Sequence, residues 1–209
     1  MAFGRIPDLV PCGPSSGASA IIGFELSRTT AELSALFGGE PCTSRLIAAQ
    51  RSALWLDMLG FIPAYTIFLL SAVVALRKSS LGLALVGFNL FLFAGALDEI
   101  EGLVMFKIMA NMPGNPHLFD GLFWTVRPKF ALLGFGETLL ALMLWRGPLL
   151  AKIASGTLLA GGLVSLRYLF FDPHAPAMMR GHSIAWTALL LVALAGAVRP
   201  ALVMRTTSD

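Results

Sequence analysis

Charged side chains inside long apolar stretches are the residues of this chain best suited to chemistry. Six of them are candidates for a binding site: Asp57, Asp98, Glu101, Lys129, Glu137 and Arg167. A charge that faces lipid is costly, so charges that persist within a membrane usually face neighbouring helices and pair there. Carboxylates in such a place bind a cation or a proton, whereas the lysine and arginine bind an anionic group.

Helical spacing predicts that most of these side chains meet at one depth. Asp98 and Glu101 are three residues apart and therefore share one helix face. Antiparallel spans bring both to the outer-leaflet level of Asp57, Lys129 and Arg167. We expect these five side chains to form a polar cluster between helices. Because two cations do not neutralise three carboxylates, one carboxyl is expected to hold a proton or an external cation.

Two more polar residues stand out. Glu137 lies eight residues beyond Lys129, which is about 12 Å deeper along a helix, and it has no partner nearby in the sequence. Tyr65 lies within an apolar run and is expected to hydrogen-bond a neighbouring helix. Two interpretations of the charged residues stay open: an interhelical ion-pair network that only stabilises the fold, and a site that binds an ion or ligand.

The elements that position these residues follow from composition. The chain has 209 residues, of which 56% are hydrophobic and 13% charged, and its mean hydropathy is +0.78. Soluble domains carry about 25% charged residues, so lipid must cover much of this surface. We predict an all-α, polytopic transmembrane bundle, because a span needs about 20 mostly apolar residues. Five runs qualify: 54–76, 83–108, 130–145, 149–171 and 183–204.

The chain divides by composition into three parts. Residues 1–52 are expected to be an irregular segment with an amphipathic helix at 18–37, and residues 10–26 are a weak extra span at most. Residues 53–204 form the five-helix bundle, and 205–209 form a cytoplasmic tail. Cys12 and Cys42 make no CxxC pair, so both a disulfide and two free thiols remain open. The start is no convincing signal peptide, because prolines and an acid follow Arg5.

Orientation follows from the basic residues in short connections. One side receives basic residues without acids: Arg77, Lys78, Arg146, Lys152, Arg199 and Arg205. This side is expected to be cytoplasmic. The prolines of the 111–128 segment predict an interfacial hairpin or half-helix on the outer side, with Trp124 at the membrane surface. Pro63 is expected to kink the first span.

Several functions lack support in the sequence. The basic residues are scattered, which gives no basis for nucleic-acid binding. His117, His174 and His182 lie in outer loops or at a helix end and lack a metal-ligand spacing. No nucleotide-binding or serine-hydrolase motif occurs, so we expect no cofactor and no metal. Thr157, Gly161 and Ser165 form a small-residue stripe that favours either an internal helix contact or a homodimer face.

Four segments carry a resemblance. They read FELSRT at 24–29, LDMLGFIPAY at 56–65, AGALDEIEG at 94–102 and KFAL at 129–132. They resemble a loose group of uncharacterised bacterial multi-pass membrane proteins with "FELART", "LDFxFIPAY", "DxxEN" and "KF" motifs. The resemblance implies the bacterial cytoplasmic (inner) membrane but no activity. It singles out residues that the depth argument also reached, namely Asp57, Tyr65, Asp98, Glu101 and Lys129. Gly102 departs from the asparagine of the group.

Three functional hypotheses follow. The first is a binding or transport protein whose cluster holds a cation, a proton or a polar lipid headgroup, and we favour this non-enzymatic role. The second is an accessory or assembly subunit of a larger membrane complex. The third is an intramembrane enzyme that modifies a lipid, with Asp98 or Glu101 as general acid or base. Expected partners are membrane lipids and either a second copy or a larger complex.

Overall fold

A computed structural model describes residues 3–15 and 17–203, and the described part of the chain is all-α. The predicted fold class is therefore confirmed. The expected tail at 205–209 lies outside the described residues. The chain divides into two compact units. Unit 1 contains Met1–Tyr65, Gly95–Lys129 and Asp172–Pro176, and unit 2 contains Thr66–Ala94, Phe130–Phe171 and Ala177–Asp209.

The N-terminal part of unit 1 is built from short helices packed on a long one. The predicted helix at 18–37 forms two pieces, α1 (Ala20–Glu25) and α2 (Thr30–Phe37). Each has its own cap, because Ser19 accepts from the amide of Ile22 and Thr29 accepts from that of Glu32. Helices of six and eight residues are too short to cross a membrane, so neither α1 nor α2 spans one.

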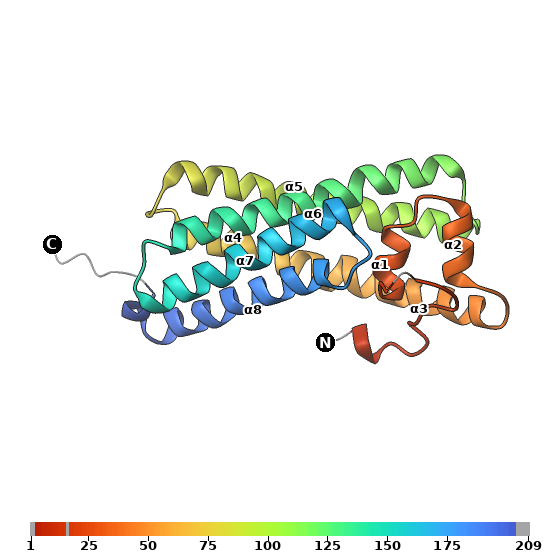
Figure 1. Cartoon of the computed structure of the whole chain (residues 1–209), viewed down its shortest axis with the longest axis horizontal. Coiled ribbons are helices and arrows are strands. Elements are labelled where there is room, and N and C mark those ends of the chain that lie inside the picture. The colour runs from red at the N-terminus through yellow and green to blue at the C-terminus, as the bar shows by residue number, and fades with distance from the viewer. Residues whose placement is uncertain (1–2, 16, 204–209) are drawn as a thin grey trace. The chain divides into compact units, whose positions relative to one another are not determined.

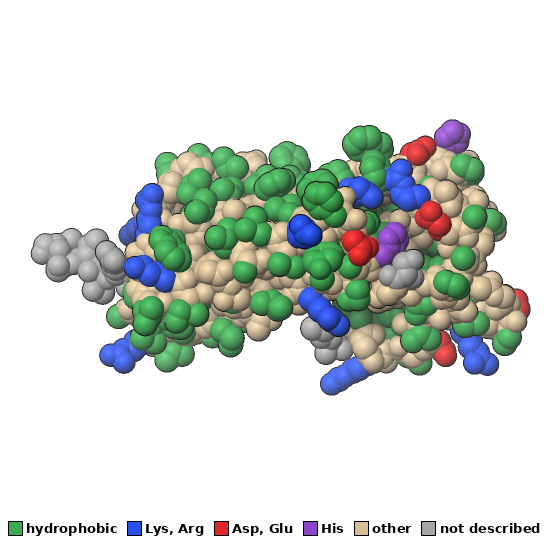
Figure 2. Space-filling view, viewed as in Figure 1, with side chains coloured by type: hydrophobic (Ala, Val, Ile, Leu, Met, Phe, Trp, Pro, Cys, Tyr) green, Lys and Arg blue, Asp and Glu red, His purple; other side chains and the backbone are tan. Residues whose placement is uncertain are grey.

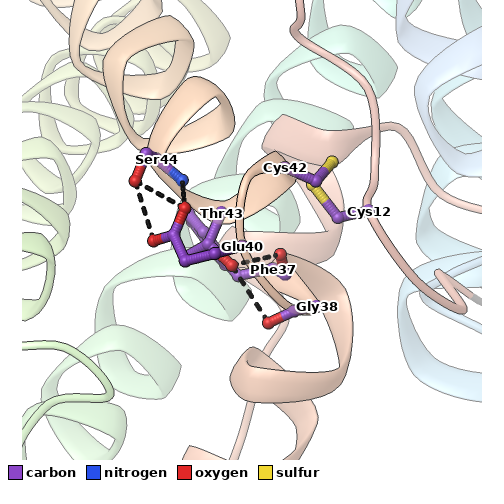
Figure 3. Close-up of a disulfide and its surroundings, with 7 residues drawn as sticks. All are labelled: Cys12, Phe37, Gly38, Glu40, Cys42, Thr43 and Ser44. Atoms are coloured by element: carbon purple, nitrogen blue, oxygen red, sulfur yellow. Dashed lines mark hydrogen bonds between the residues drawn. A yellow bond between two sulfur atoms is a disulfide. The ribbon is translucent and has the colours of Figure 1, made fainter.

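A disulfide closes this N-terminal part. Cys12 and Cys42 are bonded across 30 residues of sequence, with their Cα atoms 5.9 Å apart (Figure 3). Beside it, the Thr43 hydroxyl donates to the carbonyls of Phe37 and Gly38, at 3.1 and 3.0 Å. These bonds tie the end of α2 to the start of α3 (Cys42–Leu56). Of the two open alternatives for the cysteines, the structure has the disulfide.

The first span is one helical stretch with a widened turn. Helix α3 runs into a π-helical turn, Asp57–Phe61, and then into α4 (Ile62–Leu76). The amide of Ile62 donates to the carbonyl of Asp57, five residues back, which is the π pattern. Proline inside an α-helix clashes with the carbonyl four residues earlier. The widened turn immediately before Pro63 is thus where the expected irregularity of this span lies.

Helices α5 (Leu81–Ala110) and α6 (Pro116–Leu144) each contribute to both units. Of the two alternatives expected at 111–128, an interfacial hairpin or a half-helix, the structure has helix from Pro116, where α6 begins and continues through Pro128. Proline is well suited to the first turn of a helix. One turn before Pro128, the Thr125 hydroxyl donates to the carbonyls of Gly121 and Leu122. Only residues 111–115 connect the two helices.

In unit 2, α7 (Leu149–Phe171) and α8 (Ala177–Val198) pack side by side as a helical hairpin (Figure 1). A Cβ at Gly161 would lie 2.6 Å from the carbonyl oxygen of Gly181. The Ser165 hydroxyl donates to the carbonyl of Met178 at 2.8 Å. Two residues of the small-residue stripe, Gly161 and Ser165, therefore lie in an internal helix contact.

The surface of the long helices is apolar. In the part of the chain that the structure describes, four helical stretches are long and apolar enough to cross a membrane: Cys42–Leu76, Leu81–Ala110, Leu149–Phe171 and Ala177–Val198. Helix α6, which contains the predicted span 130–145, carries Arg127, Lys129 and Glu137 and is not among them. Large side chains such as Ile67 and Leu191 are exposed, and hydrophobic side chains cover much of the face shown in Figure 2. Such a surface is typical of a membrane protein.

Candidate functional site

The main site is a buried cluster of charged side chains in unit 1, centred on Lys129. Lys129 lies on α6, Asp98 and Glu101 lie one turn apart on α5, and Glu25 ends α1. All four residues are buried, and Lys129 is only 2% exposed. We call these four residues the Lys129 cluster.

One ammonium group serves three carboxylates. The Nζ atom of Lys129 lies 2.6 Å from Oε2 of Glu101, 2.9 Å from Oδ1 of Asp98 and 3.4 Å from Oε2 of Glu25. The Tyr65 hydroxyl donates to the other Asp98 oxygen at 2.7 Å. Asp98 therefore receives both an ion pair and a hydrogen bond. The ammonium occupies the position between the carboxylates in which an external cation would bind.

The N-terminal helices hold Glu25 in place. The buried amide of Gln50 on α3 donates to the carbonyl of Ala20 at 2.7 Å, which fixes the start of α1. The Phe24 ring packs edge-to-face on Phe37 of α2, with centroids 5.5 Å apart. Burial raises the pKa of the Glu25 carboxyl above its ordinary value, although Lys129 acts to lower it.

Two residues expected in the cluster stand apart from its ion pairs. Asp57 is half-buried and opens the π-helical turn. Arg167 belongs to unit 2 and is exposed, with its guanidinium 5.8 Å from the centre of the Phe171 ring. Because Arg167 was placed by depth alone, the prediction took no account of which side of α7 it occupies.

A second buried polar group lies in unit 2, around Glu137. Glu137 is fully buried, and its Oε1 lies 2.7 Å from Nδ1 of His182 on α8. The indole N–H of Trp186, one turn further along α8, donates to the same oxygen at 2.6 Å. The His182 ring stacks on Phe130 with centroids 5.8 Å apart. Glu137 thus has its partners on another helix, α8.

Two polar atoms of this Glu137–His182 pair make no hydrogen bond to any residue that the structure describes. They are Oε2 of Glu137 and Nε2 of His182. A Cβ at Gly162 of α7 would lie 3.2 Å from that Oε2, so glycine lets α7 approach the carboxylate closely. A carboxylate bonded to one imidazole nitrogen orients the ring and leaves the other nitrogen to accept or donate a proton.

Sequence reasoning missed two of these residues. Glu25 lies in the FELSRT segment, and an acid between Phe24 and Leu26 is the signal that points to a buried charge. His182 was expected to open the last span, but α8 begins at Ala177 and places it inside the helix. Its spacing of four from Trp186 puts both on one helix face. The binding role of the predicted residues stays a prediction.

The described residues therefore define an α-helical, multi-pass membrane protein with buried ionisable side chains in each unit. Among the described residues, no group of three or more histidine, cysteine or acidic side chains is arranged to hold a metal ion. No protein-family model matches the chain, and no curated protein and no solved structure matches it.

Proposed function

We propose that this protein is an integral membrane protein that binds and releases a proton in the Lys129 cluster. The observation that carries the proposal is the ratio of three buried carboxylates to one ammonium within 3.4 Å. If all three acids were ionised, two negative charges would remain without a cation in a buried place (three minus one). Burying an unpaired charge is expensive, and a carboxyl avoids that cost by holding a proton.

The proton belongs on Glu25 or Glu101. Both oxygens of Asp98 already have a partner, because Oδ1 pairs with Lys129 and Oδ2 accepts from the Tyr65 hydroxyl. An external metal cation is less suitable, because Lys129 already lies where the carboxylates converge. We also propose that the protein lies in the bacterial cytoplasmic membrane, with the cluster on the outer side. Disulfides persist in oxidising compartments, which supports placing the Cys12–Cys42 bond outside.

Infrared spectroscopy of the purified protein in nanodiscs tests this directly. A protonated carboxyl absorbs separately from a carboxylate, so we expect a carboxyl band in the native protein at neutral pH. Glu101→Gln should weaken this band, because it removes one of the two surplus acids. The matched control is Glu99→Gln, since Glu99 is a neighbour on α5 that makes no ion pair with Lys129.

Further variants assign the band. Glu25→Gln should weaken it as Glu101→Gln does. A band that persists in both variants and disappears in Glu137→Gln would belong to the Glu137–His182 pair, and the proposal for the Lys129 cluster would be wrong. A native protein without any protonated carboxyl at neutral pH would contradict the proposal equally.

A further inference from the structure

A groove on the surface of unit 2 has one charged end and an otherwise apolar lining. It lies between α7 and α8 and has a volume of about 490 Å³. Small residues of α7, Gly156, Ala160 and Gly161, line it together with the exposed side chains of Ile153 and Ile184. Arg180 is the one charged residue in the lining.

Among the residues that the structure describes, none neutralises Arg180. Its side chain is exposed, and it makes no ion pair or hydrogen bond with any residue that the structure describes. It lies three residues after the start of α8 at Ala177, where the free amides of a helix N-terminus also favour a negative charge. The positive charge of Arg180 therefore favours a bound molecule with an anionic group.

The helix packing shows where Arg180 lies along the groove. Gly161 lies against Gly181, so Arg180, next to Gly181, is level with Gly161, in the part of the lining that ends at Val164. From Gly161 back to Ile153, the lining of α7 continues for about 12 Å of helix without a charge. The groove therefore matches an amphiphile that has one anionic group and one long apolar chain.

Charge also argues against a second copy of this bundle as the occupant. Glu137 is the one acidic residue among the described residues of unit 2, and it is fully buried. The corresponding helices of another copy would therefore bring no acid to Arg180. An anionic phospholipid brings a phosphate at the headgroup level and an acyl chain below it.

We propose that the α7–α8 groove binds one acyl chain of an anionic phospholipid, with the lipid phosphate at Arg180. The occupied groove would cover the small residues of α7 that face outward, and the lipid would neutralise Arg180. This site is separate from the proton-binding proposal and uses none of its residues.

Native mass spectrometry of the delipidated protein, titrated with phosphatidylglycerol or with phosphatidylcholine of the same acyl chains, tests the site. The native protein should bind phosphatidylglycerol more tightly. Arg180→Gln should weaken that binding about five-fold or more, the effect of losing one basic residue near an anionic headgroup. Arg167→Gln is the matched control, because Arg167 is exposed on α7 but does not line the groove.

A second pair of variants tests the groove itself. A Cβ at Gly156 meets no atom within 4 Å, so Gly156→Leu fills the groove without disturbing the packing and should abolish the preference for phosphatidylglycerol. Gly82→Leu on α5, which is equally open, should leave it unchanged. Native affinity in Arg180→Gln overturns the proposal. The proposal is also wrong if Gly156→Leu keeps the preference for phosphatidylglycerol. It is equally wrong if Gly156→Leu changes the protein from a dimer to a monomer without changing lipid binding.

Discussion

At the level of single residues, the stability of unit 1 depends on the ion pairs of Lys129. The ammonium of Lys129 is the common partner of Glu25, Asp98 and Glu101. A buried pair that loses one partner leaves an uncompensated charge, which costs about 3–5 kcal/mol. The cluster therefore stabilises unit 1 only while the carboxyls in excess of the ammonium are protonated. The free energy of unfolding should consequently depend on pH.

Glu25 gives the sign of that dependence. Because burial raises the pKa of Glu25 above 4.5, the folded protein holds this proton more tightly than the unfolded chain does. The free energy of unfolding should therefore fall as the pH rises from 4.5 through the raised pKa. Glutamine has no proton to lose, so the Glu25→Gln protein should lack this part of the decline.

Thermal unfolding in one detergent between pH 4.5 and 8 measures the effect. The midpoint of the native protein, relative to that of Glu25→Gln, should decrease steadily with pH. Asp120→Asn serves as the control, because Asp120 is exposed in unit 1, and its midpoint should follow the native protein. A constant difference between the native protein and Glu25→Gln would mean that Glu25 titrates alike in the folded and unfolded chains.

For single residues, the sequence predicts some of the ion pairs of the Lys129 cluster but not all of its members. Helical spacing and depth brought Asp98, Glu101 and Lys129 together, as their ion pairs bear out. The same reasoning could not find Glu25, because its contact with Lys129 spans 104 residues. It also included Arg167, because depth along a helix says nothing of the direction in which a side chain points.

At the scale of elements, α7 and α8 depend on close backbone contact. Gly161 lies against the backbone of Gly181, which cannot move aside without separating the two helices. Gly161→Ala should therefore lower stability by about 1–3 kcal/mol, the usual cost of overpacking. Gly156→Ala is the matched control on the same helix, because its Cβ meets open space. There the better helix propensity of alanine should raise stability slightly.

Thermal unfolding midpoints of both alanine variants, measured in the same detergent, test this: the midpoint of Gly161→Ala should lie below that of Gly156→Ala. If Gly161→Ala were as stable as Gly156→Ala, the α7–α8 contact would be looser than the structure has it.

Elements differ in how well their sequence specifies them. Apolar runs of helical length predicted the long helices, since lipid and helix period impose a strong pattern. For the start of α6 the sequence predicts a hairpin or a half-helix, because Pro113, Pro116 and Pro128 are typical helix breakers. Pro116 instead begins the helix and Pro128 lies within it. Rules for proline that use only the local sequence do not include tertiary packing, which can tolerate a proline within a helix.

For the whole molecule, the arrangement of charges and the disulfide predict one orientation in the membrane. The connections after α4 and α6 carry Arg77, Lys78 and Arg146, and such residues favour the cytoplasmic side. The Cys12–Cys42 disulfide favours the other side. The two lie at opposite ends of the helical stretch Cys42–Leu76, so they support the same topology independently.

Labelling with a membrane-impermeant maleimide tests this orientation in spheroplasts. The native protein should remain unlabelled until a reductant opens the disulfide, after which Cys12 and Cys42 should react from outside. With both cysteines replaced by serine, Lys78→Cys should react only after the membrane is permeabilised, because Lys78 is exposed in the connection after α4. Labelling of Lys78→Cys in intact spheroplasts would reverse the topology.

The widened turn at Asp57–Phe61 has one more consequence, for how this span tolerates changes in its length. A π-helical turn contains one residue more than an ordinary helical turn. A deletion within it, combined with Pro63→Ala, would leave a regular helix whose two flanks keep their relative orientation. The same deletion elsewhere in the helix would rotate one flank by about 100° against the other. A one-residue deletion in this span is therefore best accommodated immediately before Pro63.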